Sequence, residues 1–361
     1  MTPPPRDDRP PRPAAPRLPT ALAGLADLRV DTPVTAVLSW ERSTAGSGLA
    51  QLYEGAKLAQ WNAATDIDWS LDVPFGEPLP AGSAYALDSL RASPIGRRGP
   101  RAWDDFRWQT QAWTVCQFLH GEQAAMLAGA RLAEVLPDVE AKLCAVSQAG
   151  DEARHAEAFG RYVGEHVPEP YPVSEGLRRL FADALGATEW DLLALAVQCL
   201  VEPLALAGFR LAEATFHDPL IKQITARVAR DEARHVSFGV LLLRDVVPGL
   251  SAAELARREE FLLAAVELMR RRFLLGDLWE RFEVPAAEGA AFALADPGLA
   301  GYRQMLFSRV VPMLARIGLL TPRVMRGLES MDLLSRLSAD TVARVRRERA
   351  ALGEPTGRAH A

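Results

Sequence analysis

A pentapeptide that occurs twice constrains this chain more than any other feature. Asp-Glu-Ala-Arg-His stands at 151–155 and again at 231–235, 80 residues later. Upstream of each copy, the chain reads Leu-Ala-Gly-x-Arg-Leu-Ala-Glu, at 127–134 and at 206–213, with an offset of 79. Two related pairs of helices are therefore predicted. A π-bulge in one helix would absorb the difference of one residue between the two offsets.

Each copy of the pentapeptide contains Glu-x-x-His, a spacing that suits metal binding. Glu152 precedes His155 by three residues, and Glu232 precedes His235 in the same way. Residues three apart lie on one face of a helix, so a carboxylate and an imidazole can reach the same ion. We therefore interpret each pair as a candidate half-site for a metal.

A further glutamate stands thirty residues before each of these glutamates: Glu122 before Glu152, and Glu202 before Glu232. Thirty residues correspond to one helix, a turn and a return along an antiparallel neighbour, which brings the chain back to the same height. All four glutamates and both histidines are thus predicted to converge in mid-bundle. This ligand set suits two metal ions. Without metal the four buried carboxylates would repel each other, and some would have to protonate.

The chain from residue 103 onward shows long helical patterns and no substantial sheet, which predicts an all-α protein. Turn and cap signals separate the helices, as at Asp218 and Pro219, an N-cap followed by proline. A capping box at Ser251 and Glu254 opens a fifth helix that runs to about 275. The other predicted helices cover 47–62, 103–135, 139–166, 188–216, 219–246, 297–320 (with Pro312 inside) and 321–351, while 167–187 is a longer link.

Composition divides the chain into five predicted parts. The parts are a disordered Pro/Arg-rich tail (1–20), an irregular N-terminal cover (21–102), a four-helix bundle carrying the metal ligands (103–250), additional helices packed on the bundle (251–351) and a loose tail (352–361).

Composition also excludes several classes of function. The 41 basic and 46 acidic residues give a net charge of −5, which argues against a nucleic-acid binder. The three cysteines form no CxxC pair, so we expect no disulfide framework and a reducing, cytoplasmic location. No apolar signal segment begins the chain. The apolar run at 192–209 holds Gln198, Glu202 and Pro203, so it is interpreted as a buried core helix and not as a membrane span.

On the residues above, the chain resembles the ferritin-like di-iron carboxylate superfamily over about 105–245. Its O2-activating members include bacterial monooxygenase hydroxylases, acyl-carrier-protein desaturases and ribonucleotide reductase small subunits. The resemblance implies a ferritin-like four-helix bundle, two iron ions or an Mn/Fe pair, and O2 as co-substrate. The implied metal ligands are Glu122, Glu152, His155, Glu202, Glu232 and His235.

The doubled motif looks most like the monooxygenases, in which the aspartate before each glutamate bonds a metal-bound histidine of the opposite pair. Carried over, Asp151 would orient His235 and Asp231 would orient His155. Two arginines would pair with these aspartates. They are Arg154 and Arg234.

Three departures prevent assignment to one member of the superfamily. Phe159 stands where radical-bearing reductase subunits place a tyrosine. Val228 stands where the arylamine N-oxygenases add a seventh ligand, a histidine, and Leu206 stands where the methane and toluene monooxygenases carry a threonine.

Residues at helical spacing from the ligands are predicted to line an apolar substrate pocket. They are Phe118, Leu119, Met126, Phe159, Cys199, Leu206 and Phe238. Pro203, directly after Glu202, frees a backbone carbonyl and is expected to bend the helix at the metal.

The first hypothesis is therefore an O2-dependent non-haem di-iron oxidase or monooxygenase that hydroxylates or otherwise oxidises a small, largely apolar organic substrate. Because the chain holds no flavin or Fe–S motif, an external electron donor, a ferredoxin or a reductase, is implied. N-oxygenation of an amine and ferritin-like iron handling are the alternatives. We expect no nucleic-acid or membrane partner, and a homodimer is in keeping with this type of bundle.

Overall fold

The computed structural model describes residues 28–38, 47–80, 82–83 and 85–334, together with positions 340, 343 and 347. The predicted tails, 1–20 and 352–361, lie outside the described residues. Within the described part the chain is helical, without strands, as predicted.

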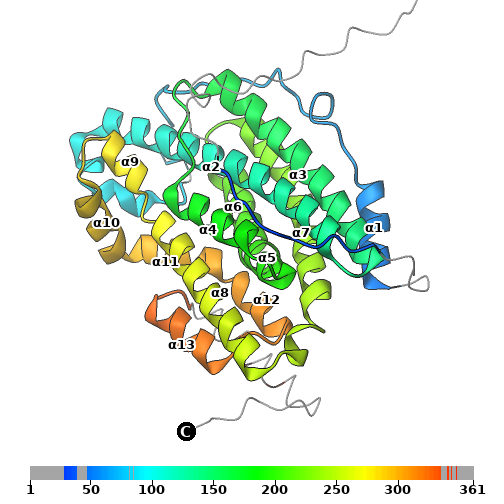
Figure 1. Cartoon of the computed structure of the whole chain (residues 1–361). Helices are drawn as coiled ribbons and strands as arrows, with labels where there is room; N and C mark the ends of the chain where they lie inside the picture. The colour runs from blue at the N-terminus through cyan, green and yellow to red at the C-terminus, as the bar shows by residue number, and fades with distance from the viewer. Residues whose placement is uncertain are drawn as a thin grey trace, which may run out of the picture.

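Four long antiparallel segments form the bundle (Figure 1). They are α2 (Pro100–Val135), α3 (Val139–His166), the α5–α6 segment (Trp190–Ala196 and Glu202–Thr215) and α7 (Pro219–Leu243). Side-chain caps fix two of the turns between them. Asp138 accepts a hydrogen bond from the backbone N–H of Ala141, and Asp218 accepts one from the N–H of Ile221.

A π-helix, Val197–Val201, joins α5 to α6, so one bundle helix does contain a π-bulge. The offset changes from 80 to 79 between Glu202 and Leu206, after this π-helix, so the bulge lies before the position that the offsets indicate. It lies directly before Glu202, whose backbone N–H bonds to the carbonyl of Val197. The whole segment Trp190–Thr215 is apolar enough to cross a membrane, but 89% of its most apolar window is buried inside the protein. It is therefore the core helix that the sequence predicted.

Close helix contacts depend on two glycines. A Cβ on Gly129 of α2 would lie 3.1 Å from the Cβ of Ala149 in α3. A Cβ on Gly239 of α7 would lie 2.7 Å from the Cβ of Gln198 in the π-helix. The absent side chains let the bundle helices approach where the metal-site residues lie.

The N-terminal region lies against the bundle as an irregular layer. It contains α1 (Gly48–Leu58), capped by Ser47, and the short 3-10 turns η2 (Asp88–Ala92) and η3 (Gly96–Arg98). Helix α1 contacts both α3 and α7. This contact brings the residues that follow α1 close to the repeated pentapeptides.

One predicted link contains a helix. Within 167–187 the chain forms α4 (Glu175–Gly186), which buries Leu177, Leu180 and Phe181 and packs on α8. With 12 residues, α4 is too short to give a strong periodic signal in the sequence between two long helices.

The C-terminal helices gather on the side of the bundle away from α1 (Figure 1). They follow the 3-10 turn η5 (Val247–Gly249) and are α8 (Ala252–Arg272), α9 (Gly276–Arg281), α10 (Ala286–Ala295), α11 (Pro297–Phe307), α12 (Val310–Arg316) and α13 (Pro322–Ser330). The predicted capping box of Ser251 and Glu254 opens α8.

The predicted single helix over 297–320 is wrong, because it breaks at residues 308–309. Pro312 has no N–H to donate to the carbonyl four residues earlier. The final predicted helix, 321–351, is described as helix only to Ser330 and at isolated later positions.

Candidate metal centre

The structure brings the six predicted metal ligands together in the middle of the bundle. Glu122 comes from α2, Glu202 is the first residue of α6, and the two Glu-x-x-His pairs come from α3 and α7. All six side chains are buried, with at most 5% of any residue exposed. A thirty-residue spacing therefore does return the chain to the same height.

The six side chains form two overlapping groups, each with its ligand atoms within 4.8 Å of one another. One group consists of Glu122, Glu152, His155 and Glu232, and the other of Glu152, Glu202, Glu232 and His235. Glu152 and Glu232 belong to both groups. Each group thus has one terminal glutamate and one histidine of its own, and two carboxylates lie between the groups.

The Nδ1 atoms of both histidines face the carboxylates. His155 Nδ1 lies 3.1 Å from Glu152 and 3.3 Å from Glu232, and His235 Nδ1 lies 3.1 Å and 3.3 Å from the same two residues. The terminal glutamates are close as well, with Glu122 3.2 Å from His155 Nδ1 and Glu202 3.6 Å from His235 Nδ1. The Nδ1 atoms are consequently the ones that could bind metal.

The Nε2 atoms face two aspartates in a crossed arrangement. His155 Nε2 lies 3.0 Å from Asp231, and His235 Nε2 lies 3.2 Å from Asp151. An Nε2–H that donates to a carboxylate leaves Nδ1 with its lone pair free for a cation. Each helix pair thus orients the imidazole of the other pair.

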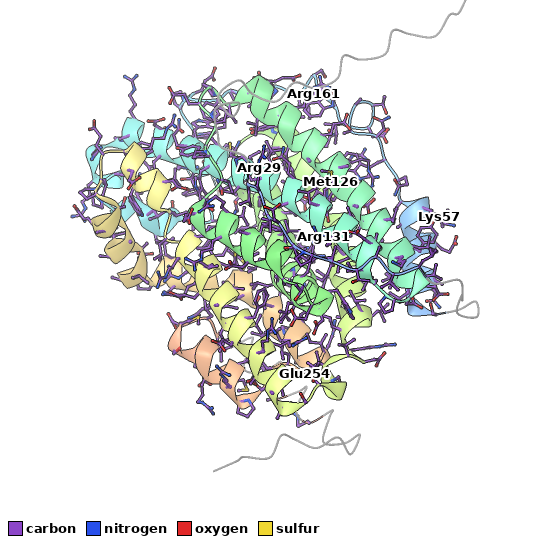
Figure 2. All side chains as sticks on the ribbon, in the orientation of Figure 1. Arg29, Lys57, Met126, Arg131, Arg161 and Glu254 are labelled. Carbon is purple, nitrogen blue, oxygen red and sulfur yellow. The ribbon has the colours of Figure 1, made fainter. Side chains whose placement is uncertain are left out.

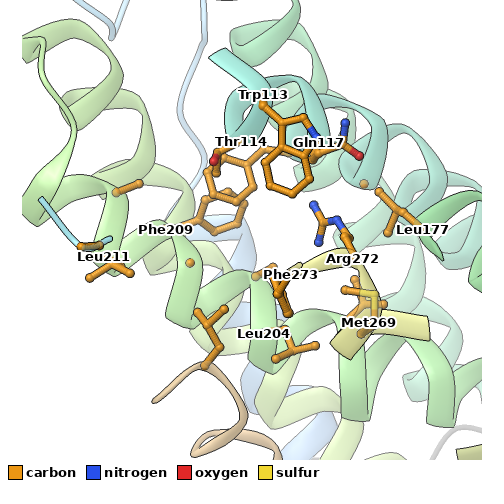
Figure 3. Close-up of a pocket in the computed structure, with 18 of the residues that line it drawn as sticks. Trp113, Thr114, Gln117, Leu177, Leu204, Phe209, Leu211, Met269, Arg272 and Phe273 are labelled. Atoms are coloured by element: carbon orange, nitrogen blue, oxygen red, sulfur yellow. The ribbon is translucent and has the colours of Figure 1, made fainter. Parts of the chain in front are cut away.

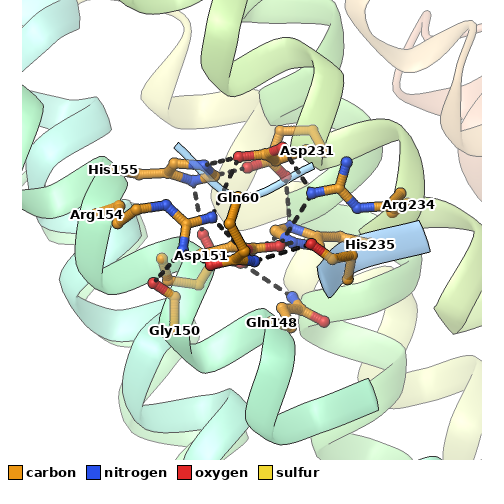
Figure 4. A network of polar contacts seen from close by, with 12 residues as sticks. Gln60, Gln148, Gly150, Asp151, Arg154, His155, Asp231, Arg234 and His235 are labelled. Atoms are coloured by element: carbon orange, nitrogen blue, oxygen red, sulfur yellow. Dashed lines mark hydrogen bonds and ion pairs between the residues drawn. The ribbon is translucent and has the colours of Figure 1, made fainter. Parts of the chain in front are cut away.

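Two arginines, whose side chains are 15% and 19% exposed, hold the aspartates (Figure 4). Arg154 pairs with Asp151 in a short contact and lies 3.7 Å from Asp231. Arg234 lies 2.6 Å from Asp231 and 3.2 Å from Asp151. Burial alone would raise the pKa of each aspartate, but the hydrogen bonds and charges of the histidines and arginines lower it. Both aspartates are therefore held as carboxylates.

The carboxylates of the centre divide into two kinds. Burial, and then the charges of Glu152 and Glu232, raise the pKa of Glu122 and Glu202 well above the usual value. Burial also acts on Glu152 and Glu232, but their contacts with the histidines hold the pKa of both below the usual value. The surrounding carboxylates outweigh burial at both histidines and raise their pKa. Without metal, protons on the two terminal glutamates and on the two histidines thus neutralise the negative charge of the centre.

The donor set fits two transition-metal ions. Glu232 Oε1 is buried and, although it lies 3.3 Å from His155 Nδ1, forms no hydrogen bond with the described residues, which is costly unless a cation or water meets it. Oxygen and imidazole donors suit iron and manganese. Two divalent ions would balance the four glutamates, while Arg154 and Arg234 balance the two aspartates. The geometry therefore fits an Fe/Fe or Mn/Fe pair.

Sequence reasoning missed residues that support the ligands. Gln148 Nε2 donates to Glu152 at 3.0 Å and to Glu202 at 2.8 Å. Gln198 Nε2, in the π-helix, donates to Gln148 Oε1 at 2.9 Å. Gln148 stands four residues before Glu152, so helical spacing could have found it. The pairing with Gln198 depends on the π-helix and leaves no local pattern in the sequence.

The N-terminal layer also reaches the centre. Trp61 Nε1 donates to Asp231 at 2.7 Å, and its ring stacks on His155 with centroids 6.1 Å apart. Gln60 donates to Asp151 at 3.2 Å and accepts from Arg154 at 2.6 Å. Gln60 lies about 90 positions before Asp151, and Trp61 lies about 170 positions before Asp231. No spacing rule links residues so far apart, so only the folded chain reveals these contacts.

A cavity of about 90 Å³ opens on one side of the centre, and all four ligand glutamates reach its wall. Aromatic and aliphatic side chains from α2, α4, α6, α8 and α11 form most of the lining (Figure 3). Among these are Phe118, Leu177, Leu204, Phe209, Met269, Phe273 and Leu306.

Of the seven predicted pocket residues, the structure places Phe118 on this cavity. The other six, Leu119, Met126, Phe159, Cys199, Leu206 and Phe238, are absent from its lining. Phe159 packs against the rings of Phe118 and Phe209, each with centroids 5.6 Å apart. Phe238 lines a smaller hollow next to Asp151. Helical spacing selects positions on every side of a ligand, whereas the cavity lies on one side of the ligands, where α8, α11 and Leu177 of α4 complete its wall.

Comparison with known families decides the relationship. The family model described as p-aminobenzoate N-oxygenase AurF matches residues 43–318. The chain belongs to this family. Solved structures of lower similarity include an R2-like ligand-binding oxidase with aerobically reconstituted Mn/Fe cofactor, at 20% identity over 80% of this chain and 93% of that chain, with a TM-score of 0.43. A single-residue mutant of an R2-like ligand-binding oxidase shows 19% identity over 87% of this chain and 98% of that chain, with a TM-score of 0.45. Comparison with curated proteins found no significant match.

Family membership confirms the prediction of an oxidoreductase of the oxygenase class, and the oxidation and N-oxygenation hypotheses both agree with it. Val228, where a seventh ligand was considered, is fully buried among apolar side chains. That position supplies no ligand, and the centre has the six side chains described above.

Proposed function

We propose that this chain is an O2-dependent oxygenase that holds two metal ions between the six clustered residues and oxidises the nitrogen of a small aromatic amine. One observation carries the proposal: two potential metal groups share Glu152 and Glu232 and face an apolar cavity. The family, whose described member is a p-aminobenzoate N-oxygenase, supports nitrogen as the oxidised atom.

When bound, the metal pair would supply the electrons and the binding positions that activate O2. The chain's own residues prepare this chemistry. Glu122 with His155 would hold one ion, Glu202 with His235 the other, and the two shared glutamates both ions. Asp231 and Asp151 keep the imidazoles in the tautomer that presents Nδ1.

Besides the metal ligands, the oxidation needs a site that keeps water from the reacting atoms, and the cavity provides it. Its wall places apolar side chains beside the carboxylates of the four ligand glutamates. An aromatic ring would fill such a space with favourable burial of apolar surface. The amine nitrogen would then lie at the glutamate end.

Oxidation of a C–H bond is the second candidate. Val228 favours it, because the seventh ligand expected of an arylamine N-oxygenase is missing at that position. The six remaining ligands are also those expected for C–H oxidation. The apolar lining would accept a hydrocarbon-like substrate as readily as an amine.

The partners and location follow from the same chemistry. Activation of O2 requires electrons, so we propose an external donor, a ferredoxin or a reductase. The three cysteines are free and buried, which supports a cytoplasmic setting. We expect a homodimer, which the molecular mass in solution would test.

The proposal is tested with iron-loaded protein, p-aminobenzoate, a chemical reductant and isotopically labelled O2. We expect products with labelled oxygen on nitrogen, identified by mass spectrometry, and no such products from Glu202→Ala. Label on a ring carbon would contradict N-oxygenation and support the second candidate. Absence of any labelled product in a metal-loaded sample would overturn the proposal for this substrate class.

A further inference from the structure

Arg272 is the last residue of α8 and lines the same cavity as the four ligand glutamates. Figure 3 shows its guanidinium extending from α8 toward Trp113 and Gln117. The mechanism above does not use this side chain. A cation on this wall, which is mostly apolar away from the ligand glutamates, therefore requires its own explanation.

No hydrogen bond or ion pair joins the Arg272 guanidinium to any of the described residues, and its Nε atom is buried without a partner. Its contacts are two aromatic rings, those of Trp113 at 5.6 Å and Phe273 at 5.5 Å from Cζ. The carboxylate of Asp277 accepts from Trp113 Nε1 at 3.1 Å and forms no ion pair with Arg272, although its negative charge favours the charged guanidinium from a greater distance. Arg272 is half-buried as a residue, and a guanidinium with a buried nitrogen is ordinarily paired, because burial of an unpaired charge is costly.

The guanidinium nevertheless carries its charge. Burial lowers the pKa of Arg272 to about 10, which is still well above neutral. The ring faces of Trp113 and Phe273 compensate part of the lost hydration. The guanidinium, a planar fork of five N–H donors, thus lines the cavity without a hydrogen-bond acceptor among the described residues.

A second donor lies on the same wall. Tyr302 of α11 lines the cavity, and its ring meets Phe273 edge to face with centroids 6.1 Å apart. Its hydroxyl has no hydrogen-bond partner among the described residues, and burial raises its pKa to about 12, so it stays protonated. A phenol and a guanidinium together form a pair of donors suited to an oxyanion.

We infer that Arg272, assisted by Tyr302, binds an anionic group of the substrate, a carboxylate, and thereby directs the opposite end of the molecule to the ligand glutamates. This inference rests on the proposed function, because it concerns the same cavity. Arg272 and the four ligand glutamates line one cavity, and no ion pair joins Arg272 to these glutamates, so the guanidinium remains available to a ligand in that cavity. Arg272 is thus a specificity-determining residue that acts by binding.

The test compares p-aminobenzoate with aniline, which has the same ring and amine but no carboxylate. Binding to the metal-loaded protein is measured by calorimetry. We expect the wild type to prefer p-aminobenzoate by about 10-fold or more, as a charge-assisted hydrogen-bonded pair provides. Arg272→Met should remove this preference and leave aniline binding within about 2-fold.

Two further variants make the result specific. Arg272→Lys should retain part of the preference, since it keeps the charge but loses the fork. Arg271→Met, one position earlier and 71% exposed at its side chain, should bind both probes as the wild type does. Equal affinity of the wild type for both probes, or an equal loss of both in Arg272→Met, would overturn the inference.

Metal content and product formation, measured on the same samples, separate this inference from the proposed function. Preferential binding of p-aminobenzoate without labelled product would contradict the proposed reaction and support the carboxylate site. Labelled product whose formation does not depend on Arg272 would support the proposed reaction and contradict the carboxylate site. A thermal midpoint of Arg272→Met close to that of Arg271→Met would show that the variant is folded.

Discussion

Each imidazole of the centre is fixed between a carboxylate cluster and an aspartate from the opposite helix pair. This arrangement follows from a sequence pattern, since the aspartate directly precedes the glutamate in both pentapeptides. The six clustered residues and the crossed aspartates could accordingly be predicted from spacing alone. Trp61 and Gln60 could not, because they come from an irregular segment with no periodicity to place them.

Replacing one aspartate tests its role in orienting a histidine. In Asp231→Asn the amide lacks the charge that holds Arg234 at 2.6 Å and stabilises the Nε2–H of His155. We expect metal affinity to fall about 10- to 100-fold, as for other residues that support metal ligands. Competition with a chromophoric chelator would measure it. Asp245→Asn, whose side chain is 80% exposed, serves as control, and equal affinities in the two variants would contradict the role.

Helix packing around the π-helix sets the position of Glu202 relative to α7. The two offsets of the repeat, 80 and 79, suggested a π-bulge but placed the step after Glu202, whereas the π-helix lies before it. Cap residues located the ends of the long helices well, because Asp138 and Asp218 act locally. The short helices α4, α9 and α10 escaped prediction, since tertiary contacts and not length stabilise them.

Gly239→Ala tests the contact between α7 and the π-helix. The added Cβ would lie 2.7 Å from the Cβ of Gln198 and 3.0 Å from its carbonyl oxygen, and neither can move without displacing the turn. We expect a loss of about 1–3 kcal/mol in the free energy of unfolding, measured with denaturant.

The matched control is Gly301→Ala in α11, where a Cβ would meet nothing within 4 Å. Alanine favours a helix, so this variant should gain up to about 1 kcal/mol. Equal effects of the two alanine substitutions would show that the contact with Gln198 is unimportant.

At the scale of the whole molecule, the bundle supplies the metal ligands and the C-terminal helices close the cavity. The sequence predicted the bundle and the additional helices, but it did not place Arg272 or Tyr302. Arg272 lies 37 positions and Tyr302 lies 67 positions after the last ligand, His235, and no motif connects them to it. The cavity is a product of packing between elements that are distant in the sequence.

Metal removal should destabilise the entire protein, because bound cations stabilise the folded state and are released on unfolding. At free metal about 100-fold above its Kd, linkage predicts about 3 kcal/mol of added stability. A chelator should therefore lower the midpoint of thermal unfolding. The Glu152→Ala, Glu232→Ala double variant should show no shift with metal or chelator, and a shift equal to that of the wild type would contradict the assigned ligands.

The central claim is that two ions share Glu152 and Glu232. Elemental analysis of protein expressed with added iron, with the double variant beside it, tests this claim most directly. We predict about two metal ions per chain in the wild type, as for other sites of this ligand set, and their loss in the variant. Absence of metal from the wild type, or equal metal in both proteins, would contradict the account.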